Sequence, residues 1–174
     1  MADIKAEGLD YLGIFRELNR KKIRYIVCGG VALNLLGIPR MTYDIDLLLK
    51  MEPSNLDTFL QVVKSWGFRP KVPVDIMGLL SDDKRRERIE KKNMKAFGIY
   101  NPRWAISEID VLIDVAVDYE TAIHRVLNKK VGGVKVPVIF PQDLIEMKRN
   151  TNRKQDEADI RYLKGLIRDG KDRI

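Results

Sequence analysis

Cysteine and histidine are nearly absent from this chain of 174 residues, which contains one of each, Cys28 and His124. A single cysteine excludes an internal disulfide and fits a reducing compartment. One cysteine and one histidine also cannot form a Cys/His zinc site. Cys28 ends an apolar run, so we expect a small buried side chain there. His124 lies in a pattern that predicts a helix and has no catalytic partner nearby, so we expect a partly buried helical residue.

Long hydrophobic runs and frequent aromatic residues are also missing. No apolar run approaches the roughly 20 residues of a membrane span, and the first residues show no apolar signal segment. We therefore expect a cytoplasmic protein that makes no membrane contact. Aromatic residues make up 7% of the chain and are not interleaved with the basic clusters. Binding of single strands by base stacking is therefore not favoured.

Charge is abundant: 33% of the residues are charged, and the formal net charge is +7. Such an excess suggests a polyanionic partner without naming it. The basic residues cluster in 82–95, where seven face four acidic ones, and again between 148 and 174. Solvated helix faces often have this composition, so both a nucleic-acid surface and a plain solvent-exposed face stay open.

The hydrophobic spacing predicts intermixed strands and helices in a single domain, 1–174, of the α/β or α+β class with one mixed sheet. Segment 82–95 is either a helix or a mobile loop, 68–80 is irregular, and 68–104 is the one sizeable candidate for an insertion. A helical part, 141–170, closes the chain. The predicted helices are 9–20, 31–36, 53–66, 121–128, 141–149 and 154–168, and the predicted strands are 23–28, 43–49, 95–100 and 108–117, with 131–140 extended around a glycine pair.

The stretch from Tyr25 to Leu49 carries the strongest chemical signal. Its first apolar run stops at Gly29-Gly30, and a glycine pair before a helix lets the backbone approach an anion. A second strand then begins with Asp44 and Asp46, whose i, i+2 spacing places both carboxylates on one face. Aspartates often occupy the exposed end of a strand, so neither feature is specific alone. Together they predict a phosphate site beside a metal site.

A third carboxylate is available on the later strand, where Glu108, Asp110 and Asp114 share the face opposite an apolar one. If the two strands are neighbours, three or more carboxylates converge and repel one another unless a cation binds. Mg²⁺, or Mn²⁺ in its place, prefers oxygen ligands and shares its coordination shell with phosphates. Two such ions would activate an attacking hydroxyl and stabilise a leaving pyrophosphate.

These residues resemble a known family. The pattern G-G-x-A-L-x-x-x-G-x-x-R-x-T-x-D-I-D-L, which begins at Gly29, resembles the first motif of the DNA polymerase β-type nucleotidyltransferase superfamily. It is most similar to the small AbiEii-like, or minimal-nucleotidyltransferase, branch. I-D-V-L resembles the strand with the third carboxylate and selects Asp110. D-L-I-x-x-K-x-x-x-x-R-x-x-D-x-x-D-I, from Asp143, resembles the C-terminal motif.

The resemblance implies the nucleotidyltransferase fold, with a small mixed sheet, flanking helices and C-terminal helices. It implies that Asp44, Asp46 and Asp110 hold the metals and perform catalysis. The residues implied at the nucleotide are Gly29, Gly30, Arg40, Thr42, Lys148 and Asp156. The last two also fit as salt-bridged residues between two packed helices, and Arg40 could pair with either a phosphate or a structural acid.

The implied reaction is metal-dependent transfer of a nucleoside monophosphate from an NTP to an acceptor hydroxyl. RNA or tRNA, a protein or a small molecule are the acceptors that the resemblance allows, and a toxin–antitoxin role is among its implications. The alternative is a non-catalytic module with this fold that binds RNA or a partner protein.

Overall fold

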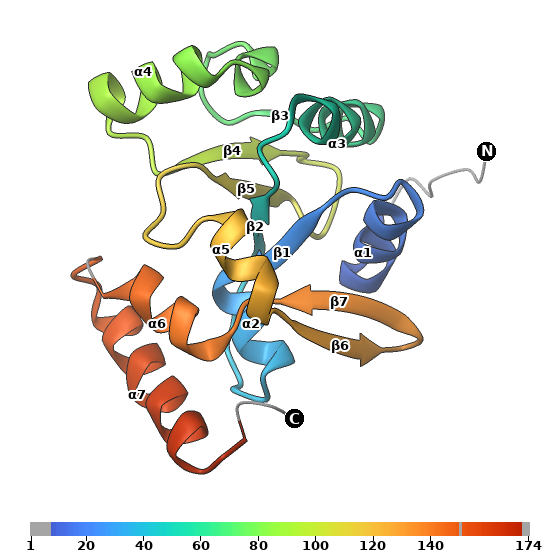
Figure 1. The fold of residues 1–174 in the computed structure, drawn as a ribbon. Helices are drawn as coiled ribbons and strands as arrows, with labels where there is room; N and C mark the ends of the chain where they lie inside the picture. The colour runs from blue at the N-terminus through green and yellow to red at the C-terminus, as the bar shows by residue number, and fades with distance from the viewer. Residues whose placement is uncertain (1–7, 150, 172–174) are drawn as a thin grey trace.

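Seven strands form one mixed sheet in the computed structural model, which describes residues 8–149 and 151–171. Their order across the sheet is β3-β4-β5-β2-β1-β7-β6, so strands far apart in sequence are neighbours in space (Figure 1). The strands are β1 (Tyr25–Cys28), β2 (Asp44–Leu49), β3 (Arg69–Pro70), β4 (Ala96–Tyr100), β5 (Glu108–Leu112), β6 (Leu127–Val131) and β7 (Val134–Val138).

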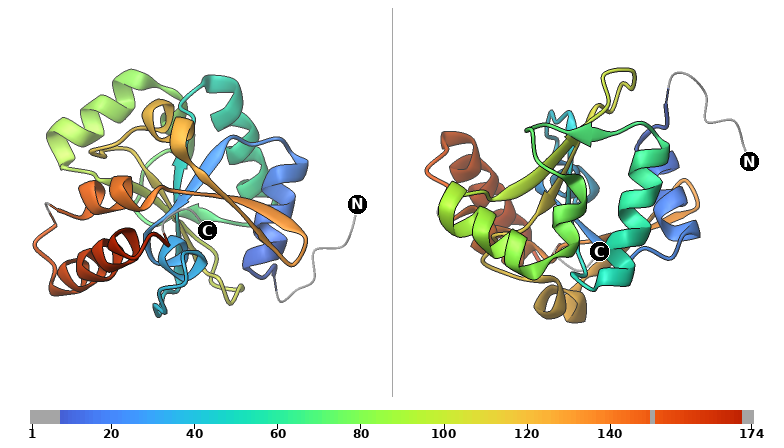
Figure 2. Two further views of the ribbon diagram at one scale, coloured as in Figure 1. Left: turned by 60° about the horizontal axis from the view of Figure 1, so that its bottom comes forward. Right: turned by 90° about the horizontal axis from the view of Figure 1, so that it is seen from above.

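Helices cover the sheet from both sides. In both views of Figure 2, α1 and α3 lie on one side of the molecule, while α4, α6 and α7 lie on the other. The helices are α1 (Tyr11–Arg20), α2 (Gly29–Leu35), α3 (Pro53–Ser65), α4 (Asp82–Lys92), α5 (Tyr119–Ala122), α6 (Pro141–Lys148) and α7 (Lys154–Arg168), with short 3₁₀ turns at Ile76–Leu80 and Ile123–Arg125.

The centre of the sheet aligns the residues of interest. Strand β2 pairs antiparallel with β1 and parallel with β5, which places Cys28, Asp46 and Asp110 side by side. Every residue of β1 is buried, as expected for a central strand, and Cys28 is fully buried. Strand β2 alternates between buried and partly exposed residues at its start, so Ile45 and Leu47 enter the core while Asp44 and Asp46 face outward.

Segment 82–95 contains a helix, α4, and not a loop, and the helix packs through arginine. Arg85 and Arg88 are both buried. The Arg88 guanidinium lies 5.4 Å from the centre of the Phe97 ring and donates to the Asp75 carbonyl at 2.9 Å. Two of the seven basic side chains of this segment therefore support the fold, and five basic side chains remain beside the four acidic ones.

The prediction of a helix over 121–128 is wrong in its second half. After the 3₁₀ turn at Ile123–Arg125 the chain enters β6, which pairs with β7 from Leu127 opposite Val138. Gly132 and Gly133 both have positive φ and close this hairpin in the conformation that two-residue hairpin turns prefer. His124 is exposed on the 3₁₀ turn and is not a partly buried helical residue.

The strand predicted over 108–117 ends at Leu112. Its partner β4 begins at Ala96, opposite Leu112, so the ladder has no further residues on that side. The N–H groups of Ile113 and Asp114 both donate to the Lys95 carbonyl, which turns the chain away. Among the helices of the described residues, none has the length and apolar character needed to cross a bilayer.

Candidate active site

Three aspartates meet on one face of the sheet. Asp44 and Asp46 come from β2 and Asp110 from β5, and the parallel register sets Asp46 opposite Asp110. One carboxylate oxygen from each residue lies within 4.8 Å of the other two. We refer to these three residues as the acidic triad. The neighbouring strands therefore bring together the carboxylates that the sequence places 64 positions apart.

The turn from β1 into α2 consists of two glycines, and the first of them lies against Asp46 of the triad. Gly29 has φ of +61°, and a Cβ atom at this position would overlap the Asp46 carboxylate. A Cβ on Gly30 would lie 2.7 Å from the Cβ of Thr42. Glycine is therefore needed at both positions, because it lets the backbone pass next to Asp46 and Thr42.

Thr42 orients the first aspartate. Its hydroxyl donates to Asp44 Oδ1 at 2.8 Å, and its carbonyl accepts from the Tyr11 hydroxyl at 3.2 Å. The threonine therefore fixes the rotamer of Asp44 from the segment that precedes β2. The sequence singled out Thr42 for the nucleotide, and the structure places its hydroxyl on a carboxylate of the acidic triad.

Asp46 is the carboxyl that the site perturbs most. Burial, and after it the negative charges of Asp44 and Asp110, raise its pKa from 3.8 to about 7, while Lys148 and Lys71 oppose the shift. A carboxyl in this position gains most from a bound cation, because the cation removes the repulsion that favours protonation. Oxygen ligands from three carboxylates match the preference of Mg²⁺ and Mn²⁺. The residues present therefore fit a divalent metal ion.

The other two acidic residues of β5 and its extension are already paired. Glu108 accepts from the Lys71 ammonium at 2.6 Å, and Asp114 pairs with Lys95. Lys71 also reaches Asp110 Oδ1 at 2.9 Å. Lys71 was missed by the sequence analysis because it lies in the irregular segment after β3, where no spacing relates it to the acidic residues.

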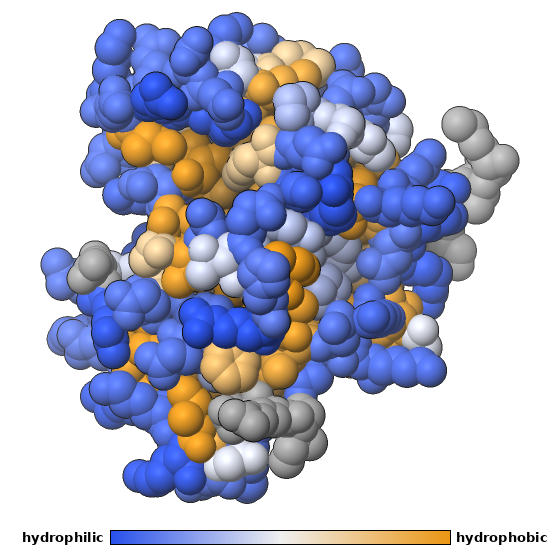
Figure 3. All heavy atoms as spheres, in the orientation of Figure 1, coloured by the Kyte–Doolittle hydropathy of each residue, from blue (hydrophilic) through white to orange (hydrophobic). Residues whose placement is uncertain are grey.

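A cleft of about 600 Å³ opens beside the triad. Figure 3 shows apolar atoms gathered in the hollow between α4 and the pair α6 and α7. The volume lies within the range usual for small-molecule sites. Asp46 and Gly29 line this cleft together with Lys148 and Asp156, whereas Arg40 does not. Its apolar lining comes from Leu112, Val115, Ala116, Leu144 and Met147.

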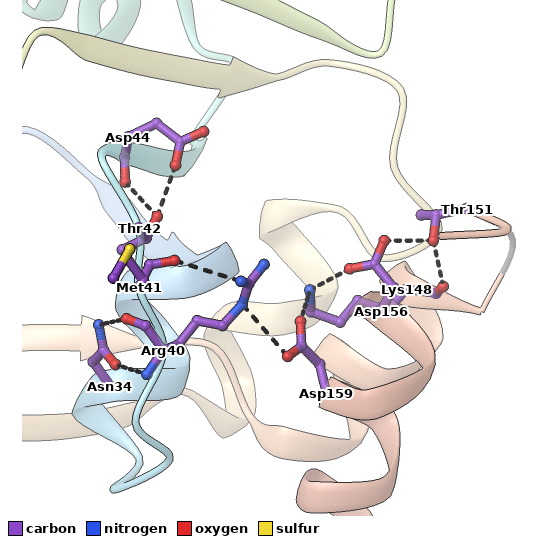
Figure 4. A network of polar contacts seen from close by, with 9 residues as sticks. All are labelled: Asn34, Arg40, Met41, Thr42, Asp44, Lys148, Thr151, Asp156 and Asp159. Atoms are coloured by element: carbon purple, nitrogen blue, oxygen red, sulfur yellow. Dashed lines mark hydrogen bonds and ion pairs between the residues drawn. The ribbon is translucent and has the colours of Figure 1, made fainter. Parts of the chain in front are cut away.

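Lys148 and Asp156 belong to a second cluster, at the junction of α6 and α7 (Figure 4). The Lys148 ammonium bonds Asp156 Oδ1 at 2.7 Å and Asp159 Oδ2 at 2.9 Å. Thr151 donates to the other oxygen of Asp156 at 2.6 Å. Both aspartates are buried, so these bonds hold α7 against α6.

Arg40 joins this second cluster from the loop between α2 and β2. Its Nε lies 3.5 Å from Asp159 Oδ1, and its backbone is held by Asn34, which accepts from the Arg40 N–H and donates to the Arg40 carbonyl. Arg40 therefore pairs with a buried acid of α7. We refer to Arg40, Lys148, Asp156 and Asp159 as the α7 network.

Solved structures with the same chain path exist at low sequence identity. The crystal structure of the lincosamide antibiotic adenylyltransferase LnuA with lincomycin bound matches with a TM-score of 0.59 and 14% identity, over 88% of this chain and 93% of that one. The antibiotic-resistance factor ANT(2'')-Ia matches with a TM-score of 0.57 and 13% identity, over 91% and 82%. An antigenic nucleotidyltransferase-like protein from Paracoccidioides brasiliensis matches with a TM-score of 0.50 and 19% identity, over 90% and 72%.

No protein-family model matches the sequence, and no curated protein matches it. The structural matches define the class: this is a mixed α/β protein with the nucleotidyltransferase fold. At such identities the likeness shows the fold alone.

Proposed function

We propose that the protein is a metal-dependent nucleotidyltransferase that moves a nucleoside monophosphate from an NTP to an acceptor hydroxyl. The observation that carries the proposal is the register of β2 and β5, which assembles the acidic triad beside the glycine turn of β1 and α2. Isolated aspartates on strand ends would not need Gly29 to clear space for one of them. The fold that the chain shares with an adenylyltransferase supports the same reaction class.

In this proposal the acidic triad binds the metal and the cleft binds the nucleotide. The triphosphate lies along the backbone of Gly29 and Gly30, next to Asp46. Lys148, which lines the cleft, is near enough to the triad to influence Asp46 and contributes positive charge there. The apolar lining of the cleft receives the less polar part of the nucleotide.

The acceptor approaches the triad at Asp110. Its hydroxyl oxygen forms a bond to the α-phosphorus, the bond from that phosphorus to the bridging oxygen breaks, and pyrophosphate leaves. The Asp110 carboxylate receives the proton of the hydroxyl as the new bond forms. A bound Mg²⁺ or Mn²⁺ would supply the charge stabilisation that this displacement needs.

The acceptor that we propose follows from the sequence motifs. These resemble AbiEii-like enzymes and favour RNA, tRNA or a protein as the acceptor. A toxin–antitoxin role belongs to the same proposal. LnuA was crystallised with lincomycin, so a small hydroxylated molecule is an equally direct candidate. Each class is tested by the same labelling experiment.

The test is transfer of label from α-labelled NTPs, supplied one at a time with Mg²⁺ or Mn²⁺, to bulk RNA, cell protein and a panel of hydroxylated small molecules. We expect label on one acceptor class with one nucleotide. Asp46→Asn should lower the rate by about a thousandfold or more, because it removes a charge that acts at the reacting phosphate. The fold should persist, since the variant relieves repulsion in the acidic triad.

Asp57→Asn is the matched control, because it removes one carboxylate charge from α3, outside the cleft. It should leave the rate within about twofold of the parent rate. Retained transfer by Asp46→Asn would contradict the assignment of the triad. Failure of the wild-type protein to bind an NTP in a metal-dependent way would favour the non-catalytic alternative.

A further inference from the structure

Glu108 adds a fourth carboxylate beside the three of the triad. In the pairing of β2 with β5, Glu108 lies opposite Asp44, one step along the same face from Asp110. Among the described residues, Lys71 is the one basic side chain that forms an ion pair with a member of the triad. Its ammonium bridges Glu108 and Asp110, at 2.6 Å and 2.9 Å. A single positive charge is therefore shared by two of these four carboxylates.

The neighbouring strand leaves space for this lysine. The Lys71 N–H donates to the Gly98 carbonyl at 2.9 Å, and Gly98 pairs with Asp110 across β4 and β5. A Cβ atom on Gly98 would lie 2.7 Å from Lys71 Cδ and 2.9 Å from Asp110 Oδ1. The Lys71 side chain thus crosses β4 at Gly98, where the strand has no side chain. Backbone anchoring and this gap direct its ammonium onto Asp110.

This pair differs from the ion pairs on the open surface. The side chains of Lys71 and Asp110 are 31% and 21% exposed, whereas those of Lys95 and Asp114 are 65% and 35% exposed. A sheltered pair is screened less by water and salt than an exposed one. Lys71 therefore neutralises part of the triad in the absence of a metal ion.

We propose that Lys71 is the internal counter-ion of the acidic triad, and that a divalent cation displaces its ammonium from Asp110 when it binds. The inference rests on the proposed function, since it assumes a metal site at the triad. An ammonium and a divalent cation on the same carboxylate repel each other, so binding of one weakens the other. The displaced ammonium stays close to Glu108. Lys71 is thus a positioning residue that sets how readily the site takes up metal.

The first test is Mn²⁺ binding to the full chain, measured by electron paramagnetic resonance with Lys71→Met and the control Lys95→Met. Both variants remove one lysine from an ion pair with an aspartate, but the partner of Lys71 is Asp110 of the triad and the partner of Lys95 is Asp114. We expect Lys71→Met to bind Mn²⁺ about tenfold more tightly than wild type, and Lys95→Met less than about threefold more tightly. Equal changes in the two variants, or none in Lys71→Met, would overturn the inference.

A second test uses the wild-type protein, so it does not depend on the folding of a variant. The rate of acetylation of each lysine by acetic anhydride is measured by mass spectrometry, with and without Mg²⁺. Release of the ammonium from Asp110 should make Lys71 react several-fold faster with Mg²⁺, while the rate at Lys95 stays unchanged. An unchanged rate at Lys71 with saturating Mg²⁺ would overturn the displacement.

The two proposals fail in different ways. If neither wild type nor Lys71→Met binds Mn²⁺, the metal site itself is wrong, and the proposed function fails together with this inference. If wild type binds Mn²⁺ and Lys71→Met binds it with the same affinity, only the role of Lys71 fails. Tighter binding by Lys71→Met supports both.

Discussion

The acidic triad and the α7 network contain the same kinds of residue but differ in charge balance. At the triad, Asp44, Asp46 and Asp110 share one partial partner, Lys71. In the α7 network two cations, Lys148 and Arg40, meet two buried carboxylates, Asp156 and Asp159. The first cluster has excess negative charge, whereas the second is neutral by itself.

Charge balance separates a site that needs a ligand from one that holds helices together. The sequence resemblance assigned the acidic triad to the metals, and it assigned Arg40, Lys148 and Asp156 of the α7 network to the nucleotide. In the structure, Asp156 and Arg40 have protein partners for their charges, and those partners dock α7 on the rest of the fold. The three carboxylates of the triad share one ammonium, that of Lys71, and Asp46 lines the cleft. Lys148 belongs to both regions, since it pairs within the α7 network and lines the cleft.

Gly29→Ala is expected to damage the triad most. The variant combines a positive φ with a Cβ that overlaps Asp46, so we expect about 4 kcal/mol of destabilisation from backbone strain and overpacking together. Gly133→Ala is the matched control, because Gly133 also has positive φ but no atom lies within 4 Å of the added Cβ. It should cost about 1 kcal/mol. Urea unfolding measures both variants, and equal losses would contradict the steric role of Gly29.

Asp159→Asn is expected to break the balance of the α7 network. Asp159 is 3% exposed and faces both Lys148 and Arg40, so its neutralisation leaves a buried excess of positive charge. Removal of one partner from a buried ion pair typically costs about 3 kcal/mol. Urea unfolding should show this loss, whereas Glu157→Gln, an exposed change on the same helix, should stay within about 0.5 kcal/mol of the parent.

If Asp159→Asn unfolds at the same urea concentration as wild type, the α7 network is not structural. In that case Lys148 and Arg40 would be free to serve a ligand, and the contrast between the two clusters would disappear. If Asp159→Asn loses little stability but much of its NTP affinity, the α7 network likewise serves a ligand and does not hold the helices together.

Local patterns were enough to predict β1, α2 and β2. The apolar run, the glycine pair and the two aspartates all lie within Tyr25–Leu49, so their geometry follows from short-range rules. The start of β5 was also predictable from alternation, and so was the face that holds Asp110. The choice of Asp110 over Glu108 needed the family resemblance, because alternation places both on the same face.

Pairing between distant segments could not be predicted. Lys71 finds Asp110 through the β3–β4 and β4–β5 pairings, which leave no spacing signal in the sequence. Leu127 and Asn128 end the segment predicted as a helix, yet the hairpin with β7 takes them into a strand. In both places tertiary contacts override the local pattern.

The dependence of stability on pH should also differ between the two clusters, although this effect is smaller. Asp46 has a pKa of about 7 in the folded, metal-free protein against an ordinary value of 3.8. Between these values the folded protein holds a proton that the unfolded chain has released, so stability falls as the pH rises from about 4 to about 7. A shift of one pKa unit corresponds to about 1.4 kcal/mol. We expect the free energy of unfolding to fall by about 2 kcal/mol over this window, which is less than the full shift implies because the neighbouring carboxylates rearrange.

Asp156 should show the opposite slope. Burial alone would raise its pKa, but hydrogen bonds from Lys148 and Thr151 hold the pKa below 3.8. Its contribution is therefore present above pH 4 and is lost as the pH falls further. Urea unfolding in EDTA from pH 2 to 8 measures both slopes: Asp46→Asn should abolish the loss between pH 4 and 7, and Asp156→Asn should alter only the acid limb. A slope between pH 4 and 7 that persists in Asp46→Asn would show that the excess charge of the triad does not reside at Asp46.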